Sequence, residues 1–101
     1  METWKNACPG DLKRYRIIAQ ALERHPNLLH SLFQTDRAQL TTSPDQIKRR
    51  TGAFSTGEKV LIRAALDIWS DQGGVLLNDL LRLDPINFKN MMMAFAERYR
   101  L

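Results

Sequence analysis

The chain has 101 residues, of which 44% are hydrophobic and 26% are charged, a balance typical of one globular domain spanning residues 1–101. Fifteen Lys and Arg against eleven Asp and Glu give a formal charge of +4, and the two signs are interleaved rather than gathered in a tail. No apolar run approaches the roughly 18 residues of a membrane span, and the single cysteine excludes an intrachain disulfide, so we expect a cytoplasmic protein without a membrane partner.

Two helices are predicted near the N-terminus, after a loosely ordered segment over residues 1–8. Over residues 11–25 apolar side chains recur at helical spacing, and charged side chains lie largely opposite them. The predicted buried face comprises Leu12, Tyr15, Ile18, Ala19 and Leu22. Pro26 ends this helix because proline lacks the donor that a helix interior needs. A short helix over residues 27–34 follows, with Leu28, Leu29, Leu32 and Phe33 as its buried stripe.

Residues 43–46, with the sequence SPDQ, form a helix start signal. Ser43 can accept a hydrogen bond from a first-turn amide, Pro44 suits the first helical position, and Gln46 can complete a capping box. Gly52 offers a left-handed end to this brief helix.

Residues 55–58, with the sequence STGE, repeat the capping-box pattern, in which Ser55 and Glu58 exchange hydrogen bonds at the start of a helix. In the helix that follows, only Lys59, Arg63, Asp67 and Ser70 form a polar stripe. A helix that is apolar over most of its circumference is buried on most sides. We therefore expect an all-α fold, a compact bundle of five to six helices around a central helix over about residues 56–70.

Two more helices are predicted after the break at Gly73 and Gly74. Residues 75–83 carry leucines at positions 76, 77, 80 and 81, which we expect to be buried on one helix face. Asp84 and Pro85 combine an N-cap with a first-position proline and start a last helix to about residue 100. Its expected inward face comprises Phe88, Met91, Met92, Phe95 and Tyr99. No run alternates with period two, so no sheet is expected.

Residues 52–59, GAFSTGEK, have the glycine spacing of a phosphate-binding loop, but Glu58 stands where that loop needs its lysine. The carboxylates fall at helix caps or in expected i, i+4 ion pairs such as Arg63 with Asp67. No nucleophile with a base and an orienting group can be assembled. We therefore expect no enzyme, no cofactor and no small-molecule substrate.

A metal site is not expected either. His25 and His30 are separated by a proline and do not share a helical face, and Cys8 has no second thiolate beside it. His25 at the end of its helix is instead expected to interact with the negative helix end.

Three consecutive methionines, residues 91–93, span about 200° of a helix and cannot all face one core. Met93 falls in line with Lys89 and near Glu97, where a flexible thioether suits a protein contact or a homo-oligomer seam, unless a neighbouring helix covers it. The sequence thus predicts partner-binding residues at Lys89, Met93 and Glu97, and at the basic turn formed by Lys48, Arg49 and Arg50.

Nucleic-acid binding is the alternative. Two basic clusters, Lys13, Arg14 and Arg16 together with Lys48, Arg49 and Arg50, would bind phosphates if they converge, or else are separate solvated faces. Residues 75–83 and 84–100 also have the lengths of a helix-turn-helix pair, whose second helix would present Asn87, Lys89, Asn90, Met93 and Glu97. We predict a small non-catalytic regulatory or adaptor protein that binds a macromolecular partner, with a protein favoured over nucleic acid.

Overall fold

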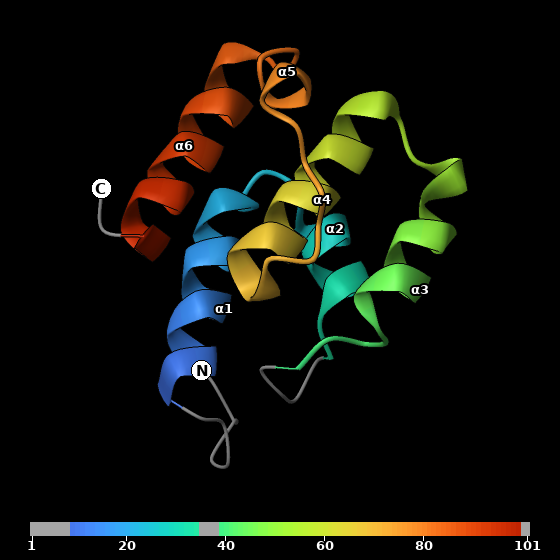
Figure 1. The fold of residues 1–101 in the computed structure, drawn as a ribbon, viewed down its shortest axis with the longest axis vertical. Coiled ribbons are helices and arrows are strands. Elements are labelled where there is room, and N and C mark those ends of the chain that lie inside the picture. The colour runs from blue at the N-terminus through green and yellow to red at the C-terminus, as the bar shows by residue number, and fades with distance from the viewer. Residues whose placement is uncertain (1–8, 35–38, 100–101) are drawn as a thin grey trace.

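The computed structural model describes residues 9–34 and 39–99, which form six α-helices and one 3-10 helix (Figure 1). These are α1 (Pro9–Ala21), α2 (Pro26–Leu32), α3 (Pro44–Arg49), η1 (Arg50–Ala53), α4 (Thr56–Ser70), α5 (Leu77–Leu80) and α6 (Pro85–Tyr99). The described ranges contain no strand, and only an isolated antiparallel bridge joins Phe33 to Leu40. The predicted all-α bundle is confirmed, whereas the prediction for residues 1–8 lies outside the described residues.

The start of α4 is fixed by the predicted capping box. The backbone N–H of Ser55 donates to Glu58 Oε1 at 3.0 Å, and the backbone N–H of Glu58 donates to Ser55 Oγ at 3.2 Å. These two bonds satisfy amide groups that the first turn of a helix leaves without partners. The helix ends at Ser70, where Asp71 adopts the left-handed conformation with φ 60°.

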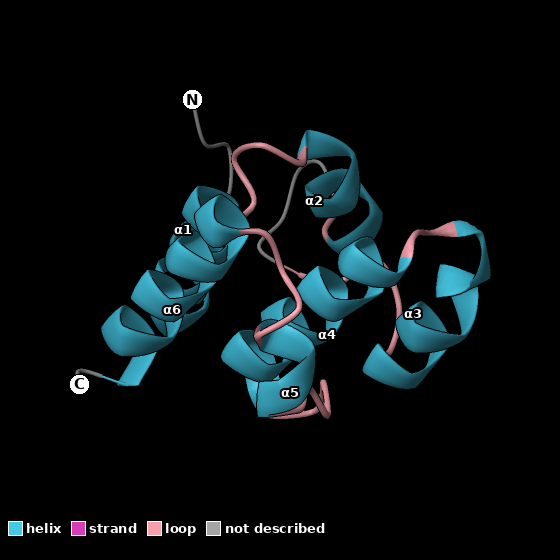
Figure 2. Cartoon of the chain, turned by 90° about the horizontal axis from the view of Figure 1, so that it is seen from above, coloured by secondary structure: helices cyan, strands magenta, loops and turns pink. Residues whose placement is uncertain are grey.

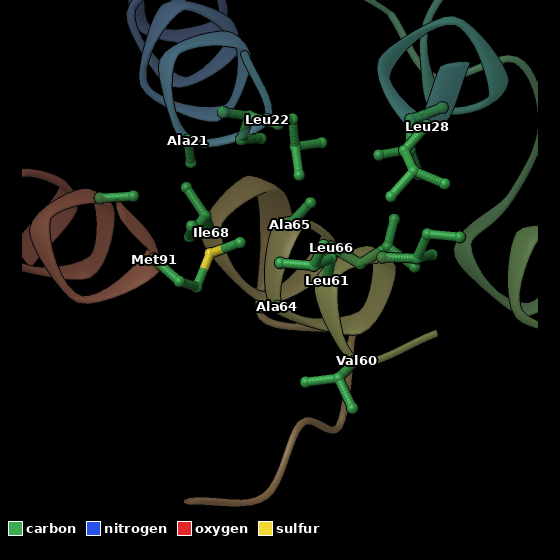
Figure 3. Packing of buried hydrophobic residues seen from close by; sticks show 14 of the residues in the cluster. Ala21, Leu22, Leu28, Val60, Leu61, Ala64, Ala65, Leu66, Ile68 and Met91 are labelled. Atoms are coloured by element: carbon green, nitrogen blue, oxygen red, sulfur yellow. The ribbon is translucent and has the colours of Figure 1, made fainter. Parts of the chain in front are cut away.

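The helix α4 lies at the centre of the bundle, as predicted. Seven of its residues are buried: Val60, Leu61, Ile62, Ala64, Ala65, Leu66 and Ile68. The helices α1, α2, α3 and α6 all pack against it (Figures 1 and 2), and Arg63 and Ser70 of its polar stripe are exposed. Figure 3 shows Leu22 of α1 and Met91 of α6 directed toward the side chains of α4.

The most extensive contact between two helices joins α1 to α6, from opposite ends of the described chain. Ile17 and Ala21 are therefore buried together with the predicted Ile18 and Leu22, while Leu12, Tyr15 and Ala19 are only partly buried. The prediction for α1 was too narrow because this helix is covered on two sides, by α4 and by α6. The prediction also carried α1 to His25, whereas the helix ends at Ala21 and a turn follows.

The start of α3 follows the prediction in its Ser43 cap and Pro44, but the Gln46 side chain does not complete a capping box, and the end of the helix differs too. Ser43 Oγ accepts from the backbone N–H of Gln46 at 3.3 Å. Gly52 was expected to end the helix in a left-handed conformation, and it instead lies within η1 without a positive φ. The hydroxyl of Thr51 donates to the Lys48 carbonyl at 2.7 Å, so a helix-end carbonyl is satisfied without a left-handed residue.

A polar network joins the corner between α1 and α2 to the start of α6. Asp84 caps α6 by accepting from the backbone N–H of Asn87 at 2.9 Å, and its second carboxylate oxygen accepts from Asn87 Nδ2 at 2.8 Å. The side-chain oxygen of Asn87 is therefore free to accept from His25 Nε2, 3.0 Å away. The expectation that His25 interacts with a helix end was wrong, because its ring is directed to buried Asn87. Asn87 accordingly cannot serve as an exposed recognition residue.

The capping box makes a prediction about acid. The bond from the Ser55 backbone N–H holds the pKa of the Glu58 carboxyl below its ordinary value of 4.5. The stabilising contribution of Glu58 is therefore present above the ordinary pKa and is lost as the pH falls through the lower pKa of the folded state. Glu58→Gln keeps an acceptor that does not titrate, so the variant should lose less stability than the wild type between about pH 6 and about pH 3. Urea unfolding at both pH values tests this, and equal losses in the two proteins would contradict it.

Candidate protein-binding surface

The segment over residues 75–83 differs most from its prediction. It was expected to form a helix that buries four leucines, but α5 is a single turn and only Leu80 is buried, at 5% exposure. Leu76, Leu77 and Leu81 are 64%, 66% and 60% exposed. Leu77 and Leu81 share a side of the chain, because the backbone N–H of Leu81 donates to the Leu77 carbonyl. We call Leu76, Leu77 and Leu81 the leucine surface.

The position of this segment follows from the path of the chain after α4. The chain turns at Asp71 and runs back alongside α4 toward α5 (Figure 1). Gly73 is buried against the α4 backbone, so that a Cβ atom on it would lie 1.8 Å from the Arg63 carbonyl oxygen. Gly74 then adopts φ 70°, a conformation that favours glycine. The returning chain thus follows the polar stripe of α4, on the solvent side of that helix.

Asp67 holds the returning chain in place. Its Oδ1 accepts from the backbone N–H groups of Gly73 and Gly74 at 2.8 and 3.1 Å, and its Oδ2 accepts from that of Val75 at 2.9 Å. The expected ion pair between Arg63 and Asp67 was therefore wrong, since the carboxylate is directed to the loop. Hydrogen bonds to a charged acceptor are stronger than neutral ones, which makes Asp67 the main anchor of residues 73–75.

Next to the leucine surface lies an open hollow of about 320 Å³, which we call the α5–α6 hollow. Its apolar walls come from both sides of the α5–α6 connection, and two aspartates lie at its edge. The lining residues are Asp67, Asp71, Val75, Leu77, Leu80, Met92, Phe95 and Tyr99. Leu77 belongs both to the wall of the hollow and to the leucine surface.

Tyr99 is one of the residues that line the hollow. Its hydroxyl donates to Asp71 Oδ1 at 2.5 Å, and its ring stacks on that of Phe95 with centroids 6.3 Å apart. The hydrogen bond to Asp71 raises the pKa of the Tyr99 phenol above its ordinary value. Tyr99 was expected on the inward face of α6, but it is 42% exposed, because it packs against the turn after α4 rather than into the core.

Because the three leucines are exposed, the fold does not gain the free energy that their burial would provide. Full burial of one leucine stabilises a protein by about 1.5–3 kcal/mol, so three leucines left nearly two-thirds exposed forgo roughly 3–6 kcal/mol. That is comparable with a large part of the net stability of a small domain. Large exposed apolar patches on folded monomers are typical of interaction sites, so the leucine surface is a candidate site of this kind.

The predicted partner-binding residues of α6 form a separate surface. Lys89, Met93 and Glu97 are exposed, with Met93 at 55%, so no neighbouring helix covers the thioether within the described residues. Met93 and Glu97 line a small groove of about 90 Å³ against Ile17, Gln20 and Ala21 of α1. This groove contains fewer exposed apolar side chains than the leucine surface.

The two basic clusters lie on helices that are not side by side, although one member of each reaches the C-terminal end of α4. In Figures 1 and 2 the helices α1 and α3 lie on opposite sides of α4. Lys13, Arg14 and Arg16 belong to α1, whereas Lys48, Arg49 and Arg50 belong to α3 and the start of η1. Lys13, Arg16, Arg49 and Arg50 are exposed on these two separate sides.

One member of each cluster is used inside the fold. The Arg14 guanidinium lies over the Trp69 ring, 5.4 Å from its centroid, and pairs with Asp11. Lys48 Nζ donates to the Gln72 carbonyl at 3.1 Å, just past the end of α4. Arg98 of α6 also reaches this end, donating from Nε to the Ile68 carbonyl at 3.0 Å. Arg98 thus donates to a carbonyl near the negative end of α4, where a cation is stabilising, and Arg14 and Lys48 also make contacts within the fold.

Comparisons of the chain with protein-family models, with curated proteins and with solved structures give no match. Among residues 9–34 and 39–99, no three His, Cys, Asp or Glu side chains are grouped so that they could hold a metal ion. No helix in the described part of the chain combines the length and the apolar character needed to cross a membrane.

The leucine surface and Asp67 were not found from the sequence. One signal was present, because the segment VLLNDLLRL has more leucines than one face of a nine-residue helix can bury. A second was the acid residue at position 67, six residues before a glycine pair, which is within reach of the amides of a chain that turns back. The helical spacing of the leucines outweighed both.

Replacing Asp67 tests the anchor. Asp67→Asn offers one acceptor oxygen instead of two and directs an NH₂ group toward backbone donors, so the variant should lose about 2 kcal/mol of unfolding free energy. Asp45→Asn is the control, because the exposed ion pair of Asp45 with Lys48, at 3.7 Å, should contribute less than about 0.5 kcal/mol. Urea unfolding measures both, and amide exchange at residues 73–75 should accelerate only in the Asp67 variant. Equal stability of the two variants would contradict the anchor.

Two glycine substitutions should act in opposite directions. Gly73→Ala places a methyl group against the Arg63 carbonyl and should destabilise by roughly 1–3 kcal/mol. Gly57→Ala, in the first turn of α4, meets no atom within 4 Å and should stabilise by about 0.4–1 kcal/mol through the unfolded chain. Thermal unfolding of both variants shows whether each substitution raises or lowers the stability. A Gly73→Ala protein as stable as the wild type would show that residue 73 is not in close contact with the α4 backbone.

Proposed function

We propose that the protein is a small non-catalytic regulatory or adaptor protein that acts by binding another protein through the leucine surface. The observation that carries the proposal is the exposure of Leu76, Leu77 and Leu81, each at 60% or more, beside the α5–α6 hollow. The proposal retains the expectation of a cytoplasmic protein, which the single cysteine supports.

The exposure of the leucines is built into the fold. Asp67 and Gly73 bind the chain before the leucine surface to the solvent side of α4, and Asp84 caps α6 directly after it. Only one turn of helix lies between these two fixed points, and it directs Leu80 into the core. A rigid support of this kind favours binding, because a surface that is already ordered loses less conformational entropy when a partner docks.

The positions and contacts of the basic side chains favour protein binding over nucleic-acid binding. A phosphate backbone needs cations on one continuous surface. Here the two basic clusters lie on opposite sides of α4, and Arg14 and Lys48 are engaged at the end of that helix. The leucine surface, by contrast, offers apolar side chains next to a recess, the arrangement found at the centre of protein interfaces.

The double variant Leu77→Ser/Leu81→Ser tests the proposal. Both side chains are mostly exposed, so the substitutions should leave the fold intact, which thermal unfolding checks. In quantitative affinity capture from an extract of the native host, proteins bound by the wild type should be recovered at least about tenfold less by this variant.

Met93→Ser is the matched control, since it removes an equally exposed apolar side chain on α6. It should leave the capture unchanged. Loss of capture with Met93→Ser but not with the leucine variant would move the binding site to the surface formed by Lys89, Met93 and Glu97. Capture of nucleic acid alone, weakened steeply by added salt, would contradict the proposal in favour of the basic clusters.

A further inference from the structure

We infer that the protein bound at the leucine surface is a second copy of this chain, related to the first by a two-fold axis near α5. The inference rests on the proposed function, because it takes the leucine surface to be a protein-binding surface and names its occupant. Three properties of the surface carry the inference: its charge, its shape and its size.

The charges around α5 match a second copy of themselves. The segment over residues 75–83 has one carboxylate, Asp79, and one cation, Arg82, so it is neutral in a chain whose formal charge is +4. Neither side chain has a hydrogen bond or ion pair with the described residues. Across a two-fold axis a contact between two different residues occurs twice. Asp79 of each copy can then pair with Arg82 of the other, and two unpaired charges per chain acquire partners.

The surface carries both of the shapes that a two-fold interface needs. A two-fold interface uses the same patch on both copies, so the patch must carry a protrusion and a recess together. The exposed side chains of Leu76, Leu77 and Leu81 provide the protrusion, and the α5–α6 hollow of about 320 Å³ provides the recess. Leu77 belongs to both the leucine surface and the hollow. A leucine of one copy can therefore enter the hollow of the other, and the same contact forms a second time across the two-fold axis.

The size of the surface indicates a weak dimer. The exposed residues at this corner are Asp71, Leu76, Leu77, Asn78, Leu81, Arg82, Asp84, Pro85, Ile86 and Tyr99. A standard stable interface uses about 20–30 residues on each side. The corner offers about a third to a half of that, so a dissociation constant of tens to hundreds of micromolar is expected. The chain should be monomeric at a few micromolar and mostly dimeric near a millimolar.

Sedimentation equilibrium of the full chain over about 5–800 µM tests the inference. The weight-average mass of the wild type should rise from that of one chain toward that of two. Leu77→Ser/Leu81→Ser should weaken dimerisation at least about tenfold, whereas Met93→Ser should leave it unchanged. A wild type that stays monomeric throughout, or a dimer that survives the leucine substitutions, would overturn the inference.

Charge reversal supplies a test that a folding defect cannot imitate. Asp79→Arg and Arg82→Asp each place like charges opposite one another in the symmetric dimer, so each variant alone should associate about tenfold more weakly. Mixed together, the two variants restore both opposite-charge pairs and should form a heterodimer at least as stable as the wild-type dimer. Failure of the mixture to associate would overturn the two-fold pairing of Asp79 with Arg82.

The results separate this inference from the proposed function. A chain that remains monomeric but captures host proteins through its leucines leaves the proposed function standing and overturns the second-copy occupant. A chain that dimerises through its leucines but captures no host protein supports the second-copy occupant and contradicts the role as an adaptor.

Discussion

The constraint on which the rest of the structure depends is the burial of α4 on all sides but one. Four helices cover its apolar circumference, so the chain that leaves its C-terminal end can return only along the polar stripe. The buried Gly73 lets the backbone approach the Arg63 carbonyl there, and Asp67 binds the next three amides. Leu76, Leu77 and Leu81 are thereby held on the solvent side of α4, which explains why these apolar side chains of a folded protein remain uncovered.

The C-terminal end of α4 is also the point where other elements converge. Arg14 from α1, Lys48 from α3 and Arg98 from α6 all reach the stretch between Ile68 and Gln72. The carbonyl groups in the last turn of a helix lack internal partners and carry partial negative charge, so Arg98, which donates to the Ile68 carbonyl, compensates this end of the central helix. Part of the positive charge of this chain therefore serves its own architecture rather than a ligand.

Local signals predicted where three of the helices start. Ser55 and Glu58 gave the start of α4, Ser43 gave the start of α3, and Asp84 with Pro85 gave the start of α6. These motifs act over three or four residues, so they can be read from sequence alone. The central position of α4 was predicted from the apolar residues around its circumference, which can also be read from the sequence alone.

The remaining features depend on contacts between residues distant in sequence. The bond between His25 and Asn87 joins positions 62 residues apart, and it changes an apparently exposed asparagine into a buried one. The exposure of the leucines depends on the close approach of Gly73 to the Arg63 carbonyl, and helical periodicity does not predict this approach. The two predicted partner surfaces on α6 and on α3 were placed by exposure arguments, whereas the leucine surface could be found only from the path of the backbone.

The contact between α1 and α6 has a consequence for how the chain reaches this fold. It is the most extensive helix contact, and it closes the longest loop in the described chain. A contact between residues so distant in sequence forms after the local ones, because the entropy of closing the loop is lost before the contact can form. A nascent chain that has emerged only as far as α4 therefore exposes the apolar sides of both α1 and α4. This domain should therefore complete its folding in one cooperative step, once the residues of α6 have left the ribosome.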